Sequence, residues 1–94
     1  MPLTRQVSFI AVIGKGNRIQ IPTLIRWEFK LEITQLLTVT VCLFKRGINE
    51  AFYTKMNKDG RITIPKINAE IIKTQLPKET TPNQHAFEIT LRPA

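Results

Sequence analysis

The chain has 94 residues, of which 43% are hydrophobic, and its 14 lysines and arginines against 7 acidic residues give a formal net charge of +7. This length is typical of one domain, the apolar fraction excludes a disordered chain, and no apolar run is long enough to cross a bilayer. A charge this positive favours a polyanionic partner, nucleic acid above all, because the field of the protein draws in phosphate groups.

A nine-residue segment occurs twice. Residues 14–22 read Gly-Lys-Gly-Asn-Arg-Ile-Gln-Ile-Pro, and residues 57–65 read Asn-Lys-Asp-Gly-Arg-Ile-Thr-Ile-Pro, 43 positions later. Each copy predicts a tight turn closed by a residue that tolerates positive φ, then a short strand, then a helix that begins at the proline. Neither half has enough apolar sequence to form a core alone. We therefore expect one domain, 1–94, built from two intertwined repeats at about 7–46 and 50–92.

In chain order, the hydrophobic pattern predicts a mostly β fold with two short helices. The first strand, at 7–13, is apolar on both faces, so we expect both faces to be covered. The later elements are a helix at 23–30, a strand at 36–44, a charged turn at 45–49, a strand at 51–56, a helix at 66–74, a polar loop at 77–84 and a strand at 87–91.

Trp27 is the one tryptophan of the chain and falls in the first predicted helix. The i, i+3 and i+4 spacing places it on one helix face with Leu24 and Leu31, which favours packing in the core or at an interface. Stacking on a nucleic-acid base is the alternative.

Little in the sequence indicates catalysis. With one His, one Cys and one Asp, no spacing matches a metal site, and we expect no catalytic residue, metal or cofactor. Gly14 and Gly16 lack the third glycine and the following helix of a dinucleotide fingerprint. His85 is interpreted as an ordinary residue of the polar loop, and Cys42 as a small buried hydrophobe. A single cysteine and the absence of a secretory pattern at the N-terminus predict an intracellular protein.

The signal for binding is that basic residues recur at the same places in both copies. Lys15 and Lys58 lie in the two turns, and Arg18 and Arg61 begin the two short strands. Two more cations, Arg26 and Lys66, fall near the helix starts, where backbone N–H groups favour phosphate. If a pseudo-two-fold axis relates the halves, both turns lie on one surface and these six cations converge there.

The repeated Asn/Gly-Arg-Ile-x-Ile-Pro segment, followed by a short helix and an alternating strand, resembles the AbrB/MazE/SpoVT swapped-hairpin family of DNA-binding regulators. The resemblance covers about residues 7–41 and 51–91. In that family two such units, normally from two chains, intertwine into a β-rich DNA-binding body. The resemblance thus implies a tandem swapped-hairpin, β-barrel-like pseudo-dimer within one chain.

By position, the resemblance assigns the family's basic residues to Arg18 and Arg61 after the turns, Lys66 past the proline, Arg26 in the helix and Lys55 before the turn. The matching positions of the other copy hold Thr23, Ala69 and Val12, which implies two unequal halves. The full set expected to bind DNA is Lys15, Asn17, Arg18, Arg26, Lys55, Lys58, Arg61 and Lys66.

Together these features predict a transcriptional regulator that binds double-stranded DNA in the cytoplasm, associated with the nucleoid. One alternative is an architectural protein that coats or bends DNA with low sequence specificity. Another is an antitoxin-like protein-interaction module, although such antitoxins append a toxin-wrapping tail and this sequence continues only three residues past its last predicted strand. Whether the two-repeat chain also forms a homodimer is left open.

Overall fold

The two halves of the chain follow the same order of elements, a strand, a short strand, a helix and a long strand. The computed structural model describes residues 5–77, 80 and 84–94, so the predicted loop at 77–84 lies largely outside the described residues. The elements are β1 (Val7–Ala11), β2 (Arg18–Gln20), α1 (Thr23–Glu28), β3 (Leu37–Leu43), the 3-10 turn η1 (Phe44–Arg46), β4 (Ile48–Thr54), β5 (Arg61–Thr63), α2 (Lys66–Gln75) and β6 (Phe87–Pro93). The fold is mostly β with two short helices, as predicted.

The strands of the two halves alternate in space. A four-stranded antiparallel sheet has the order β1-β6-β3-β4, and a separate two-stranded ladder pairs β2 with β5. Each of the pairings β1–β6, β6–β3, β3–β4 and β2–β5 joins a strand of the first half to a strand of the second. The halves are therefore intertwined. The two sheets remain open, and no closed barrel forms within the described residues.

A pseudo-two-fold axis relates the halves. In the small ladder Ile19 pairs with Ile62, its own repeat equivalent 43 residues later. In the large sheet Thr40 pairs with Thr90, which is 50 residues later. The difference of seven residues (50 minus 43) is the extra length that the second half carries between its helix and its last strand.

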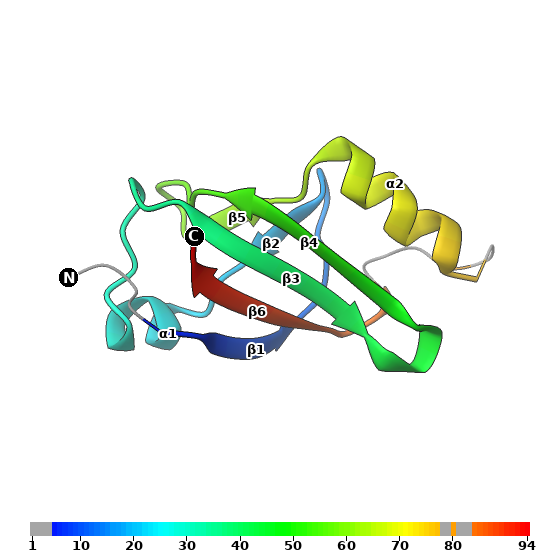
Figure 1. The fold of residues 1–94 in the computed structure, drawn as a ribbon, viewed down its shortest axis with the longest axis horizontal. Helices are drawn as coiled ribbons and strands as arrows, with labels where there is room; N and C mark the ends of the chain where they lie inside the picture. Colours follow the sequence, from blue (N-terminus) through cyan, green and yellow to red (C-terminus); the bar gives the residue numbers. More distant parts are fainter. Residues whose placement is uncertain (1–4, 78–79, 81–83) are drawn as a thin grey trace.

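The core lies between the two sheets. In Figure 1 the β2–β5 ladder lies behind the four-stranded sheet, and α1 and α2 lie toward opposite ends of the long axis. The ladder and the residues just after it contribute the isoleucines of the repeat, each at most 2% exposed, namely Ile19, Ile21, Ile62 and Ile64. The large sheet contributes alternate residues such as Val39, Val41, Ile89 and Leu91, each 0% exposed. The alternation of buried and exposed side chains is what the strand pattern predicts.

Both repeated turns have the predicted backbone geometry. Asn17 has φ +58° and Gly60 has φ +76°, the left-handed region that closes a tight turn. The N–H of Gly14 donates to the carbonyl of Arg18 at 2.7 Å, and the equivalent bond from Asn57 to Arg61 is 2.9 Å. The turn chemistry visible in the sequence thus fixes both turns.

The prediction that the first strand is covered on both faces is wrong. Ile10 is 64% exposed and Val12 is 50% exposed, because the four-stranded sheet has the ladder on one side only. The strand also ends earlier than predicted, since Ala11 pairs with Phe87, the first residue of β6, and residue 12 has no partner strand. In the second half β4 begins earlier than predicted, because Ile48 already pairs with Leu43.

Of the two packing roles favoured for Trp27, core or interface, the core role is wrong. Trp27 and Leu24 are each 78% exposed, whereas Ile25 and Phe29 pack against the core. A helix of six residues presents only one narrow face to the core, and that face is the one defined by Ile25 and Phe29. Of the three residues predicted to share a helix face, Leu24, Trp27 and Leu31, only Leu31 packs against the core.

Candidate nucleic-acid interface

The outward side of the β2–β5 ladder, here called the ladder face, consists of Arg18, Gln20, Arg61 and Thr63. All four side chains are exposed, while Ile19 and Ile62 between them point into the core. Arg18 lies opposite Thr63, and Gln20 lies opposite Arg61, so the two arginines are diagonal neighbours. Both arginines are therefore exposed on the side of the ladder away from the core.

Three of the predicted binding residues surround one hollow. A depression of about 450 Å³ lies between the ladder face and the first turn (residues 14–17), and its lining residues are Val12, Gly14, Lys15, Arg18, Gln20 and Arg61. Lys15 and Arg18 come from the first half and Arg61 comes from the second. The antiparallel ladder therefore brings cations that are 46 residues apart in sequence (61 minus 15) to one site.

Gln20 links the two halves at this site. Its Oε1 accepts a hydrogen bond from Arg61 Nε at 3.0 Å, and its Nε2 donates to the carbonyls of Asp59 and Gly60, both at 3.2 Å. The Nε of Arg61 is thereby held, while the side chain as a whole is exposed. Gln20 is absent from the predicted set. Its role follows from the cross-strand register, which a single-strand pattern does not give.

The second turn (residues 57–60) has a hydrogen-bond network of its own. Asn57 Oδ1 accepts from the N–H groups of Asp59 at 2.9 Å and Arg61 at 3.1 Å, and the Gly60 N–H donates to the Asn57 carbonyl at 3.0 Å. Asparagine is well suited to this arrangement because its side chain can bond to backbone amides that follow it. The network fixes the turn from which Arg61 emerges.

Arg26 lies at the second turn rather than at the turn of its own half. Its guanidinium packs against Gly60, its Nη2 donates to Thr23 Oγ1 at 2.9 Å, and its Nε is buried without a hydrogen-bond partner in the described part of the chain. The reason is the antiparallel ladder, in which each strand ends beside the opposite turn. The Ile21 N–H donates to the Gly60 carbonyl at 2.9 Å, which places the start of α1 there.

The same geometry moves Lys66 to the first turn. The Ile64 N–H donates to the Asn17 carbonyl at 2.8 Å, so α2 begins beside Asn17. Asn17 itself is half-buried, whereas Lys66 is exposed. Lys55 and Lys58 are also exposed but do not line the hollow. Of the six cations expected to converge, three line the hollow, namely Lys15, Arg18 and Arg61.

The two repeated turns contain one acidic residue, Asp59, which is exposed beside Lys58. Within residues 5–77, 80 and 84–94, none of the seven lysines and arginines of the predicted set forms an ion pair. Neither helix has a side-chain cap or an acidic residue in its first turn. The charge on this side of the molecule is therefore open to an anionic partner.

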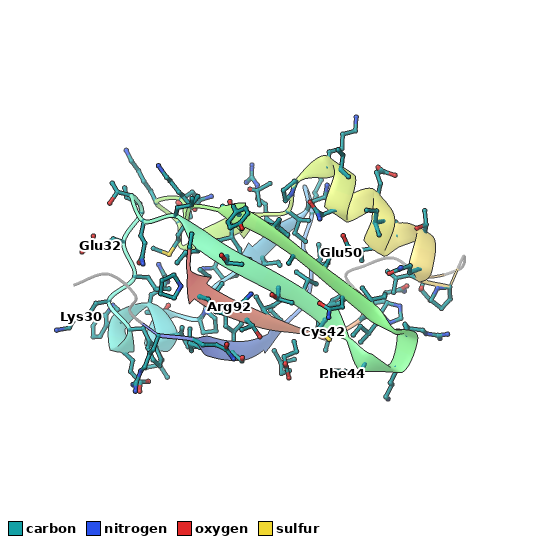
Figure 2. All side chains as sticks on the ribbon, in the orientation of Figure 1. Lys30, Glu32, Cys42, Phe44, Glu50 and Arg92 are labelled. Carbon is teal, nitrogen blue, oxygen red and sulfur yellow. The ribbon has the colours of Figure 1, made fainter. Side chains whose placement is uncertain are left out.

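The side of the large sheet away from the ladder has a hollow that is lined by more apolar residues than the one beside the ladder face. This second hollow, of about 440 Å³, lies at the end of β3 and includes Ile10, Cys42, Phe44, His85 and Glu88 in its lining. Figure 2 shows Cys42 and Phe44 near the end of β3, far from Lys30, which follows α1 at the other end of the molecule. Cys42 is half-buried rather than buried. His85 Nε2 and Thr80 Oγ1 are 3.0 Å apart, and the imidazole meets the Phe87 ring edge-on.

Two further properties bear on the classes of function. No cluster of three or more His, Cys, Asp or Glu side chains in the described residues could hold a metal ion. No described helix combines the length and apolarity that crossing a membrane requires.

The comparisons with known proteins give a structural likeness. No protein-family model matches the chain, and no curated protein matches it either. The chain is similar to the solution structure of PHS018 from Pyrococcus horikoshii, with a TM-score of 0.71 and 18% sequence identity, over 99% of this chain and 94% of that chain. At this identity the likeness shows a shared fold and carries no argument about ligands.

Proposed function

We propose that the chain binds double-stranded DNA through the ladder face and its two turns, and that it acts as a transcriptional regulator. The observation that carries the proposal is the open hollow bordered by Lys15, Arg18 and Arg61, three exposed cations without acidic partners among the described residues. Cations placed in this way neutralise phosphates and release counterions, which is the main source of affinity for duplex DNA.

The form of the ladder supports the same proposal. Two antiparallel strands lie about 4.8 Å apart, and a two-stranded ribbon fits the major groove, which is about 12 Å wide. The ladder face presents Arg18 and Arg61, which suit guanine. Thr63 can contact either a base edge or the thymine methyl group. These side-chain types favour base readout in addition to phosphate contact.

The resemblance to the AbrB/MazE/SpoVT swapped-hairpin family is consistent with this function and with a nucleoid-associated protein of the cytoplasm. Arg18 and Arg61 occupy the family's basic position after the turn, and the intertwined strand order is the arrangement that the resemblance implies. In the mechanism that we propose, Lys15, Lys55, Lys58 and Lys66 contact phosphates. Arg18 and Arg61 on the ladder face contact phosphates and some base edges.

The test is a titration of the chain against a selected duplex and against random duplex of equal length. We expect binding to both, with the selected sequence bound at least about a thousandfold more tightly, as specific DNA-binding proteins do. Equal affinity for the two would favour the architectural alternative. No binding at low salt would exclude DNA as the partner.

A further inference from the structure

The two halves of the proposed DNA-binding surface differ at positions that the pseudo-two-fold axis makes equivalent. The unlike pairs, first half before second, are Val12 and Lys55, Gly14 and Asn57, Gly16 and Asp59, Asn17 and Gly60, Gln20 and Thr63, Thr23 and Lys66, and Arg26 and Ala69. In a homodimer such pairs would be identical, and the surface would fit a palindrome. A single chain removes that constraint.

The differences make the second turn more constrained than the first. In the second turn the N–H of Asp59 is bonded to Asn57 Oδ1 and the N–H of Gly60 to the Asn57 carbonyl. In the first turn, which lies wholly within the described residues, the equivalent N–H groups of Gly16 and Asn17 donate no hydrogen bond. Glycine at position 14 cannot supply the side-chain acceptor that Asn57 provides.

The two arginines of the ladder face are also held differently, because Gln20 lies opposite Arg61 and Thr63 lies opposite Arg18. Arg61 is bonded through Nε to Gln20, which is anchored in turn to two carbonyls of the second turn. Arg18 faces Thr63 instead, makes no side-chain hydrogen bond within the described residues, and has its Nε beside Gly16, 3.7 Å from where a Cβ would be. A donor fork that is fixed before binding discriminates better between base pairs than one that can adjust.

We propose that the protein binds a non-palindromic duplex in one orientation. The half-site met by Arg61 and the second turn is read strictly, and the half-site met by Arg18 and the first turn is read loosely. This inference rests on the proposed function and adds to it the class of DNA sequence that the surface recognises.

The first experiment is selection of bound sequences from a random duplex library. The expected consensus lacks two-fold symmetry, and single base changes in its strict half weaken binding by roughly tenfold or more, against a few-fold in the other half. A palindromic consensus, or two halves of equal strictness, would overturn the inference and leave DNA binding intact. Failure to bind any duplex would overturn both.

Paired substitutions then assign the strict half. Gln20→Thr removes the anchor of Arg61, so we expect discrimination in the strict half to fall roughly tenfold. Thr63→Gln places the same amide opposite Arg18, so we expect discrimination in the loose half to rise. If the two variants weaken the same half equally, Gln20 does not position Arg61 for recognition.

Amide hydrogen exchange provides a readout that needs no DNA. In the free protein we expect the amides of Asp59 and Gly60 to exchange at least about tenfold more slowly than those of Gly16 and Asn17, because only the first pair is hydrogen-bonded. Equal rates would contradict the difference between the turns even if the chain binds DNA. A clear difference without DNA binding would instead place the failure in the proposed function.

Discussion

The guanidinium of Arg26 packs against the α-carbon of Gly60, so closely that a Cβ at position 60 would overlap it. The repeat equivalents of these residues are Ala69 and Asn17, which are joined by the same pseudo-symmetry. At the second turn the large helix residue Arg26 is paired with Gly60. At the first turn the small helix residue Ala69 is paired with Asn17. This exchange explains why the turn residue of the second copy is glycine.

The contact between Arg26 and Gly60 predicts a coupling that can be measured. Gly60→Ala should destabilise the fold by about 2–3 kcal/mol, part from placing alanine at positive φ and part from displacing Arg26. Gly47 is the matched control, since it has φ +66° and a Cβ added there would meet no atom within 4 Å. Gly47→Ala should cost only about 1–2 kcal/mol.

Urea unfolding of the single and double variants checks this prediction. In an Arg26→Ala background the cost of Gly60→Ala should fall to that of Gly47→Ala. An unchanged cost would mean that Arg26 swings into solvent freely and does not depend on Gly60.

Part of this architecture can be predicted from the sequence, because the relevant signals are local. Asn17 and Gly60 indicate the turns, Pro22 and Pro65 mark the helix starts, and the alternating isoleucines indicate which ladder residues are buried. These features depend on φ preferences and on side-chain alternation within a few residues.

The remaining features depend on which strand lies beside which, and that is not a local property. Exposure of Ile10 depends on whether anything covers the far side of the large sheet. The bond between Gln20 and Arg61 and the placement of Arg26 at the second turn depend on the antiparallel register of β2 and β5. Sequence proximity assigns Arg26 to its own turn, which is wrong because the halves exchange partners.

The intertwined pairing predicts that the first half does not fold alone. Every strand pairing in the two sheets crosses from one half to the other, so a chain of residues 1–46 loses all of them. We expect this fragment to be unfolded or to form an obligate dimer, as judged by circular dichroism and sedimentation. A folded monomer of that length would contradict the prediction, and mixing with residues 47–94 should restore the fold.

The core assignment predicts very different effects for two isoleucines. Ile19 is fully buried at the axis, so Ile19→Ala should reduce the free energy of unfolding by about 2–5 kcal/mol. Ile10 is 64% exposed, so Ile10→Ala should change it by less than about 0.5 kcal/mol. Chemical denaturation measures both. Similar losses would mean that the far side of the large sheet is covered in solution, for instance in a homodimer.

Arg18 and Arg61 should matter for DNA more than for folding. Each change to alanine should weaken binding by about 1–3 kcal/mol if the arginine contacts a base edge. Stability should change by less than about 1 kcal/mol, with the larger change at Arg61 because it loses its bond to Gln20. Fluorescence anisotropy and thermal melting separate the two effects. A drop of several degrees in melting temperature with unchanged binding would make these arginines structural.

The central claim, that the cations around the ladder bind duplex DNA, is tested most directly by the salt dependence of affinity. If about five to seven cations meet phosphates, the logarithm of the binding constant should fall against the logarithm of salt concentration with a slope near −5. Lys15→Ala should reduce the slope by about one unit, because one phosphate contact is lost. Lys45→Ala removes the same charge beside the hollow on the far side of the large sheet and should leave the slope unchanged. A complex insensitive to salt, or no complex at low salt, would contradict the claim.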